Sequence, residues 1–194
     1  MRNSVFSEAP ANVFNEIVMG AGMFVDTFVP STAVIGNVLF ATDGGANFTA
    51  TPNFIDLADG IDNVPPNTKE LKDIDYWDVT MSGTGKTVNP AQVKRLLAGA
   101  DVDGTDATKI TPRNYLKASD FEDFWWLGPV AKTAAGSDST YLAIHILNSL
   151  STGGMQMQSA NRDKGSFPFT FTGHYSMTDL DQVPFEIYCK NPTT

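Results

Sequence analysis

Residues 83–87 carry the first pattern that could do chemistry. They read Gly-Thr-Gly-Lys-Thr, which matches the end of a phosphate-binding loop. The complete motif needs a glycine where Thr80 stands. It also needs a helix that opens at the Lys-Thr pair, whereas Val88 and Asn89 separate that pair from Pro90. We therefore interpret the segment as a hairpin turn and not as a nucleotide site.

The sequence offers few metal ligands or nucleophiles. Residues 101–106 hint at a calcium loop, but the EF-hand spacing needs glycine at Asp106 and glutamate at Pro112, so a solvated acidic turn is the simpler interpretation. The single cysteine, Cys189, excludes a Cys-based zinc cage and is expected to be a small buried residue. His174 is expected to have a structural role. We predict no catalytic residues, no metal site and no cofactor.

A third pattern combines acidic and aromatic residues. Glu122 and Asp123 precede Trp125 and Trp126, as carboxylates beside stacking rings do in glycosidases and sugar-binding modules. Carboxylates this close in sequence rarely face each other across a bond, and tryptophans are more often core or interface residues. The pattern leaves two alternatives open: a carbohydrate-binding or adhesin-type β-sandwich that uses the two tryptophans, and a glycoside hydrolase that uses Glu122 or Asp123.

Alternating side chains predict the strands that would position these residues. Residues 47–54 alternate polar and apolar side chains, so one face of the strand is wet and the other is dry, and Pro52 favours an edge position or a bulge. Asp43, Gly44 and Gly45 predict a turn that pairs this strand with another over 34–41. Further strands are predicted over 73–82, 141–147, 166–172 and 183–189.

One helix is predicted. Asn89 is a plausible N-cap, Pro90 suits the first helical position, and apolar residues at 93, 96 and 97 form a stripe that would lie against a sheet. Residues 121–127 fit either a helix or a strand. The sequence therefore predicts a mainly β fold, an antiparallel β-sandwich or flattened barrel with one flanking α-helix. Residues 1–30 would form an N-terminal arm, and 31–194 a single β-sandwich domain with a long acidic loop at about 55–71.

Charge and hydropathy exclude two classes of partner. The 194 residues include 13 Lys and Arg against 22 Asp and Glu, and residues 43–78 alone hold eight acidic and two basic residues. This balance argues against a nucleic-acid reader, which needs a basic face, and against a polybasic membrane binder. The most apolar run near the start, Ile17–Val25, is too short to span a bilayer. We expect a chain made in the cytoplasm.

Short segments spread over most of the chain carry a family resemblance, from about Phe14 to Tyr188. They are Ala50–Pro52, Asn67–Lys72, Trp77–Val79, Leu97–Val102, Lys109–Arg113, Asp120–Phe121, Trp125–Gly128, Asn148–Gly154, Lys164–Phe167, Phe171–Ser176 and Val183–Tyr188. With these segments in this order along the chain, the sequence resembles the major tail protein, or tail tube subunit, of long non-contractile-tailed bacteriophages.

The resemblance implies a structural virion protein without catalytic residues. Its subunits would assemble into hexameric rings that stack into a hollow tube around a tape measure protein. The tube would meet tail terminator and baseplate proteins, and double-stranded DNA would later pass through without specific binding. The protein would be made in the cytoplasm of a bacterial host and reside in the virion tail. A related ring protein, such as a terminator or a baseplate hub, remains an alternative.

The resemblance also implies which residues face the bore, because the family's inner sheet is continuous around the lumen. Polar strand faces then become lumen candidates, while the acidic loop at 55–71 and the N-terminal arm are candidates for contact between rings. The predicted lumen-facing residues are Asn47, Thr49, Thr51, Asp78, Thr80, Thr170 and Thr172.

Overall fold

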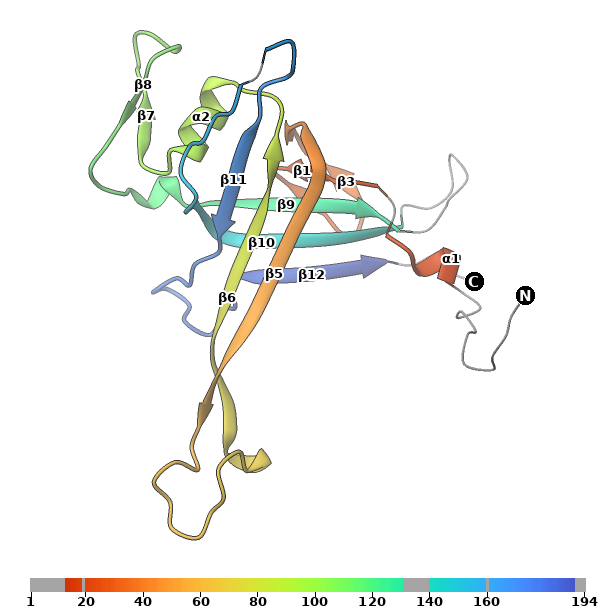
Figure 1. Ribbon diagram of the computed structural model, residues 1–194, viewed down its shortest axis with the longest axis vertical. Helices are drawn as coiled ribbons and strands as arrows, with labels where there is room; N and C mark the ends of the chain where they lie inside the picture. The colour runs from red at the N-terminus through yellow and green to blue at the C-terminus, as the bar shows by residue number, and fades with distance from the viewer. Residues whose placement is uncertain (1–12, 19, 131–139, 160, 191–194) are drawn as a thin grey trace.

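The strands of the computed structural model form two antiparallel sheets that cross each other (Figure 1). The structure describes residues 13–18, 20–130, 140–159 and 161–190. The first sheet has the order β4 (Val38–Phe40), β1 (Met23–Val25), β9 (Glu122–Pro129), β10 (Tyr141–Ser151) and β12 (Phe185–Lys190). The second consists of β5 (Thr42–Asp56), β6 (Lys72–Gly85) and β11 (Phe167–Thr172). The predicted mainly β, antiparallel fold is confirmed.

Smaller elements flank the two sheets. Two short hairpins are β2 (Phe28–Val29) with β3 (Val34–Ile35), and β7 (Ala100–Val102) with β8 (Ile110–Pro112). The helical elements are α1 (Val13–Glu16), α2 (Pro90–Leu96) and the 3-10 turns Lys69–Leu71 and Ala118–Asp120.

The core lies between the inner faces of the two sheets. β11 contributes Phe167, Phe169 and Phe171, which are all buried because they alternate with polar residues along the strand. The first sheet contributes aromatic and aliphatic side chains such as Phe124 and Ile146 to the same core. Stacked and edge-on ring contacts join the layers, as between Phe124 and Phe171, whose centroids lie 5.1 Å apart.

β10 connects the sheets because it takes part in both. Residues 141–146 pair with β12 on one side and β9 on the other, whereas Leu150 and Ser151 pair with β11. Its apolar residues are buried on both sides, as a central strand requires, so the strand predicted over 141–147 is confirmed and extends to Ser151. The undecided segment 121–127 belongs to strand β9.

The β5–β6 hairpin extends well beyond the sandwich. The two strands pair from Thr42 opposite Gly85 to Asp56 opposite Lys72, and the connecting residues 57–71 form the far end of the molecule (Figure 1). We call residues 57–71 the arm tip. The Asp56 side chain closes it, because Asp56 Oδ2 accepts a hydrogen bond from the Asn67 backbone N–H at 2.8 Å and Asp56 Oδ1 accepts one from the Ala58 backbone N–H.

The predicted helix forms as its signals indicate. Asn89 Oδ1 accepts a hydrogen bond from the Gln92 backbone N–H at 2.9 Å, and Pro90 occupies the first turn. Leu96 is buried against the core. Ala98, two residues after the end of the helix, adopts the left-handed conformation with φ of 61°.

Three sequence predictions about β5 and its neighbours are wrong. The partner of β5 is β6 rather than the segment 34–41, which splits into β3 and β4. Gly44 and Gly45, with φ of 75° and 79°, form a bulge inside β5 rather than a turn, because glycine adopts the left-handed conformation that either structure needs. Residues 83–85 continue β6 instead of forming a hairpin turn.

Two further predictions need correction. Part of the predicted N-terminal arm is core: β1 lies between β4 and β9, and Phe24 and Val25 are buried. The N-terminal twelve residues of that arm lie outside the described part. Cys189 is exposed rather than buried, because it stands near the end of β12, the last strand of the first sheet.

Candidate functional site

The seven polar residues predicted to line a lumen lie on one face of the second sheet. Strand register aligns them in rows that cross β5, β6 and β11. The rows are Asn47–Ser82–Thr170, Thr49–Thr80–Thr172 and Thr51–Asp78. We call this surface the polar face and define it by the residues of these three rows together with Asn53.

Strict alternation along three neighbouring strands produces the polar face. Each outward polar residue sits between inward residues of the core, so that Thr80 lies between Val79 and Met81, both fully buried. β6 stays in register with β5 on one side and with β11 on the other. Because one face of this sheet packs against the core, the residues between the buried ones all point to the opposite, solvent-facing side. Ser82 and Asn53 complete the face although they are absent from the predicted set. The alternation that identified their neighbours also applies to them.

Hydrogen bonds within the polar face hold several of its side chains. Asn53 Nδ2 donates to Asp78 Oδ2 at 2.8 Å, and the Thr172 hydroxyl lies 2.7 Å from that of Thr152, which extends the polar surface beyond β11. The β5 residues of the face at 47, 49 and 51 are exposed, as is Asp78, whereas Thr80, Thr170 and Thr172 are half-buried.

The polar face presents hydroxyl and amide groups and almost no charge. Asp78 is its single ionisable residue, and neither lysine nor arginine occurs among the residues that define it. A surface of this kind supplies no cation to neutralise a phosphate, so it contributes none of the counterion release that drives protein binding to DNA.

The candidate phosphate and calcium motifs are not sites. Residues 83–85 are strand, and α2 starts only at Pro90, so no helix N-terminus follows the Lys-Thr pair. Asp103 Oδ1 accepts backbone hydrogen bonds from Thr105 and Asp106, and these lower the pKa of the Asp103 carboxyl. Across the described part of the chain, no group of acidic, histidine or cysteine side chains is arranged to hold a metal ion.

Alternation along β9 places Glu122 and Trp126 on one face of the strand and Asp123 and Trp125 on the other. Trp126 belongs to the core between the sheets, and Trp125 packs on the other side of the first sheet with Phe28. Their exposed fractions are 8% and 7%, so neither ring offers an open face for a sugar. Glu122 accepts two hydrogen bonds from Arg95, at 2.8 and 2.6 Å, and Asp123 points to the opposite side of the strand.

Both histidines make structural contacts. His174 Nδ1 lies 3.2 Å from the Asn148 carbonyl oxygen, and its ring meets Phe121 edge-on. The His145 ring stacks on Trp125 with centroids 4.0 Å apart, and His145 Nδ1 lies 3.5 Å from Glu186 Oε2. The hydroxyl of Tyr188 donates to the same Glu186 oxygen, which raises the pKa of Tyr188.

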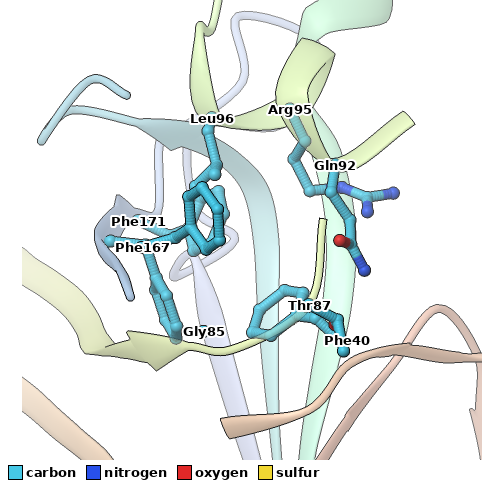
Figure 2. Close-up of a pocket in the computed structure, with 9 residues that line it drawn as sticks. Phe40, Gly85, Thr87, Gln92, Arg95, Leu96, Phe167 and Phe171 are labelled. Carbon is cyan, nitrogen blue, oxygen red and sulfur yellow. The ribbon is translucent and has the colours of Figure 1, made fainter. Parts of the chain in front are cut away.

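A small hollow opens between α2 and the end of the second sheet (Figure 2). Phe40, Phe167 and Leu96 form much of its wall, and Gln92 and Arg95 stand at its rim. Gln92 Nε2 donates to the Leu39 carbonyl, whereas Gln92 Oε1 is buried and has no hydrogen-bond partner. The space of about 10 Å³ suits about one water molecule and is too small for a substrate.

No protein-family model matches this chain, and no curated protein matches it either. In the described residues, none of the helices has the length and apolar character that crossing a bilayer requires. The polar face keeps one continuous register across the three strands β5, β6 and β11.

Proposed function

We propose that this protein is a tail tube subunit: identical copies form rings, the rings stack into a tube, and the polar face lines the bore. The observation that carries the proposal is the polar face itself. It combines three adjacent strands, a row-by-row register and an absence of basic residues, which suits a wall past which DNA moves without binding. Rings of this kind belong to the tail of a virion.

Ring closure would use the open edges of the sheets. β5 is the last strand of the second sheet, so the outer side of its backbone pairs with no other strand among the described residues. An edge of this kind accepts a strand from another chain, and a contact that joins different surfaces of identical copies closes into a ring when the rotation allows it. Pro52 interrupts the donors along this edge and limits how far such pairing extends.

The partners in this proposal are a second copy of the chain, a tape measure protein inside the growing tube, and terminator and baseplate proteins at its ends. Double-stranded DNA crosses the bore in transit. The neutral hydroxyl surface stays hydrated and offers no fixed cation, so each base pair meets the same weak interaction as the one before it.

The first test is electron microscopy of the concentrated, purified protein in negative stain, with native mass spectrometry of the same sample. We expect rings and tubes and a mass series that ends at a closed ring. A chain that remains monomeric at every concentration, with and without a tape measure partner, contradicts the proposal.

The second test asks whether the polar face lines the bore. Thr49→Lys with Thr172→Lys places two cations on it, and tubes built from this variant should retain DNA fragments at low salt, whereas wild-type tubes should release them. Ser31→Lys with Thr32→Lys adds the same charge on the β2–β3 hairpin, away from the second sheet, and is the matched control. Equal DNA retention by both variants would exclude the polar face as the wall of the bore.

A further inference from the structure

Three places in the chain carry an aspartate that is directly followed by a glycine. They are Asp43–Gly44, Asp59–Gly60 and Asp103–Gly104. At such a pair the glycine nitrogen stands within reach of the aspartate carboxyl carbon, and a bond between the two closes a ring. Glycine has no Cβ to hinder the approach, and its backbone turns easily. Because the three pairs share this local chemistry, the fold decides which of them reacts.

The Asp59–Gly60 pair lies in an exposed turn of the arm tip. The Ile61 backbone N–H closes the turn by donating to the Ala58 carbonyl at 3.2 Å. With the described residues, neither the Asp59 carbonyl nor the Gly60 N–H forms a hydrogen bond, and the Asp59 carboxylate forms neither a hydrogen bond nor an ion pair. Gly60 has a φ of 78°, and no atom lies within 4 Å of the place where a Cβ would stand. Rotation of this peptide plane therefore breaks no hydrogen bond.

The Asp103 carboxylate is engaged in its own loop. Asp103 Oδ1 accepts hydrogen bonds from the backbone N–H groups of Thr105 at 2.9 Å and Asp106 at 3.0 Å. Turning the carboxyl onto the Gly104 nitrogen would break both bonds. They also lower the pKa of Asp103 and so keep the carboxyl ionised, and an ionised carboxyl is a poor electrophile. Asp103 is therefore held away from ring closure.

The Asp43–Gly44 pair is held by the second sheet. Asp43 is paired with Thr84 of β6, and Asp43 Oδ2 lies 3.2 Å from Lys86 Nζ. Gly44 has a φ of 75°, but the ladder resumes at Ala46, so paired residues enclose the bulge on both sides. Rotating the peptide between Asp43 and Gly44 requires local opening of the sheet, which the exposed turn does not need.

We propose that Asp59 is a site of spontaneous isomerisation, at which the folded chain forms isoaspartate while Asp43 and Asp103 are protected. The Gly60 nitrogen bonds to Cγ of Asp59, and one carboxyl oxygen leaves Cγ as water with the carboxyl proton and the Gly60 amide proton. Water then attacks the Asp59 backbone carbonyl carbon of the succinimide. The bond from this carbon to the Gly60 nitrogen breaks, the nitrogen takes up a proton, and the main chain continues through Cγ.

The reaction needs no oxidant, cofactor or enzyme, and the mass of the chain is the same before and after it. The product has one more methylene in the main chain of the arm tip, and its free carboxylate stands on the former backbone carbon. This inference does not depend on the proposed function.

Ageing of the dilute folded protein at mildly acidic pH, in water enriched in oxygen-18, tests the proposal. We expect isoaspartate at residue 59 with one heavy oxygen, read by electron-transfer mass spectrometry and by methylation with an isoaspartate-specific carboxyl methyltransferase. In guanidinium chloride all three pairs should react at similar rates. Folding should slow the reaction at Asp43 and Asp103 by about tenfold or more and leave the rate at Asp59 nearly unchanged, because only the first two need local opening.

Two variants control for the chemistry. Asp59→Glu keeps the charge but needs a larger ring, so isoaspartate should not form at this position. Asp59→Asn forms the same succinimide with ammonia as the leaving group and should produce isoaspartate faster. Circular dichroism should show the same thermal transition for both.

Two outcomes would overturn the proposal. One is a folded protein that forms no isoaspartate at residue 59 while the unfolded chain forms it. The other is a folded protein in which all three pairs react at equal rates. A chain that builds no rings would contradict the proposed function and leave this inference intact.

Discussion

Trp126 illustrates how single residues fix the first sheet. Its indole Nε1 donates to the Ala21 carbonyl at 3.3 Å, and its ring lies across Gly22 and Gly128, where a methyl group at either position would overlap the ring. Gly22 also has a φ of 71°, whereas the backbone at Gly128 is ordinary. Glycine is therefore required at position 128 only because the Trp126 ring leaves no room for a side chain. A substitution there tests packing without adding backbone strain.

Gly128→Ala should lower the free energy of unfolding by about 1–3 kcal/mol, because the buried indole must move out of a close-packed position. Urea denaturation followed by tryptophan fluorescence measures the change. Gly104→Ala is the control, since no atom lies within 4 Å of the methyl group it adds. Equal stability of the two variants would show that the Trp126 ring adapts without cost.

A buried ion pair joins the β7–β8 hairpin to the 3-10 turn at Ala118–Asp120. Arg113 Nη2 donates to both Asp120 oxygens, at 2.6 and 2.8 Å, and the exposed fractions of the two side chains are 8% and 0%. Burial raises the pKa of Asp120, but hydrogen bonds from Arg113 and from the Lys117 amide outweigh it, so the pKa lies below its ordinary value of 3.8.

Stability at acid pH should depend on Asp120. A carboxyl with a lowered pKa in the folded state stabilises the protein fully above the unfolded value of 3.8, and that contribution disappears as the pH falls through the lower folded value. Asp120→Asn should therefore lower the free energy of unfolding at pH 7. Below about pH 4, the stability of this variant should fall less steeply with decreasing pH than that of the wild type. Thermal unfolding measured from pH 7 to pH 2 checks both parts. An unchanged acid slope in the variant would assign the loss to other carboxyls.

At the scale of elements, β11 shows how one strand serves two surfaces. Phe169 is buried and contacts Phe24 edge-on with centroids 5.3 Å apart, whereas Thr170, the next residue, belongs to the polar face. Because of this alternation, substitutions at neighbouring positions should lower the free energy of unfolding by different amounts.

Phe169→Ala should lower the free energy of unfolding by about 3–5 kcal/mol, since it opens a cavity among packed rings. Thr170→Ala removes a partly exposed hydroxyl and should change stability by roughly 1 kcal/mol or less. Chemical denaturation of the two variants gives the comparison. A large loss of stability in both variants would show that the Thr170 hydroxyl makes a stabilising contact.

The sequence predicted strand faces better than strand partners. Alternation is a local property, so the wet and dry sides of β5, β6 and β11 could be assigned from neighbours two residues apart. Strand pairing is not a local property. Two glycines favour a bulge as much as a turn, so Gly44 and Gly45 were assigned to the wrong structure. The connection through residues 57–71 is long, and its sequence does not indicate that β5 pairs with β6. Seven of the nine residues of the polar face were predicted from this alternation, but their arrangement in rows across the sheet required the register.

At the scale of the whole molecule, the arm tip stands apart from the packed core of the sandwich. The core clusters hold side chains from both sheets, and the exposed apolar residues of the arm, including Leu57 and Ile61, contribute nothing to them. Folding should therefore depend on the sandwich, and the proposed stacking of rings should depend on the arm tip.

Replacing residues 58–70 by Asn-Gly, which favours a tight two-residue hairpin, should leave the thermal transition of the monomer nearly unchanged. The same variant should form rings that do not stack, because the arm tip is missing. Differential scanning calorimetry and negative-stain microscopy check the two parts. Long tubes from the shortened chain would show that the arm is dispensable for stacking.

The direction of the β5–β6 hairpin has a mechanical consequence. The hairpin runs along the longest axis of the molecule, and its strands pair along nearly their full length (Figure 1). If one arm is anchored in the copy beyond it, a pull along that axis strains the ladder between β6 and β11 in shear. Many hydrogen bonds then share the tension and must fail together instead of unzipping one by one. Such a filament would bend and stretch at the joints between copies before any single copy came apart.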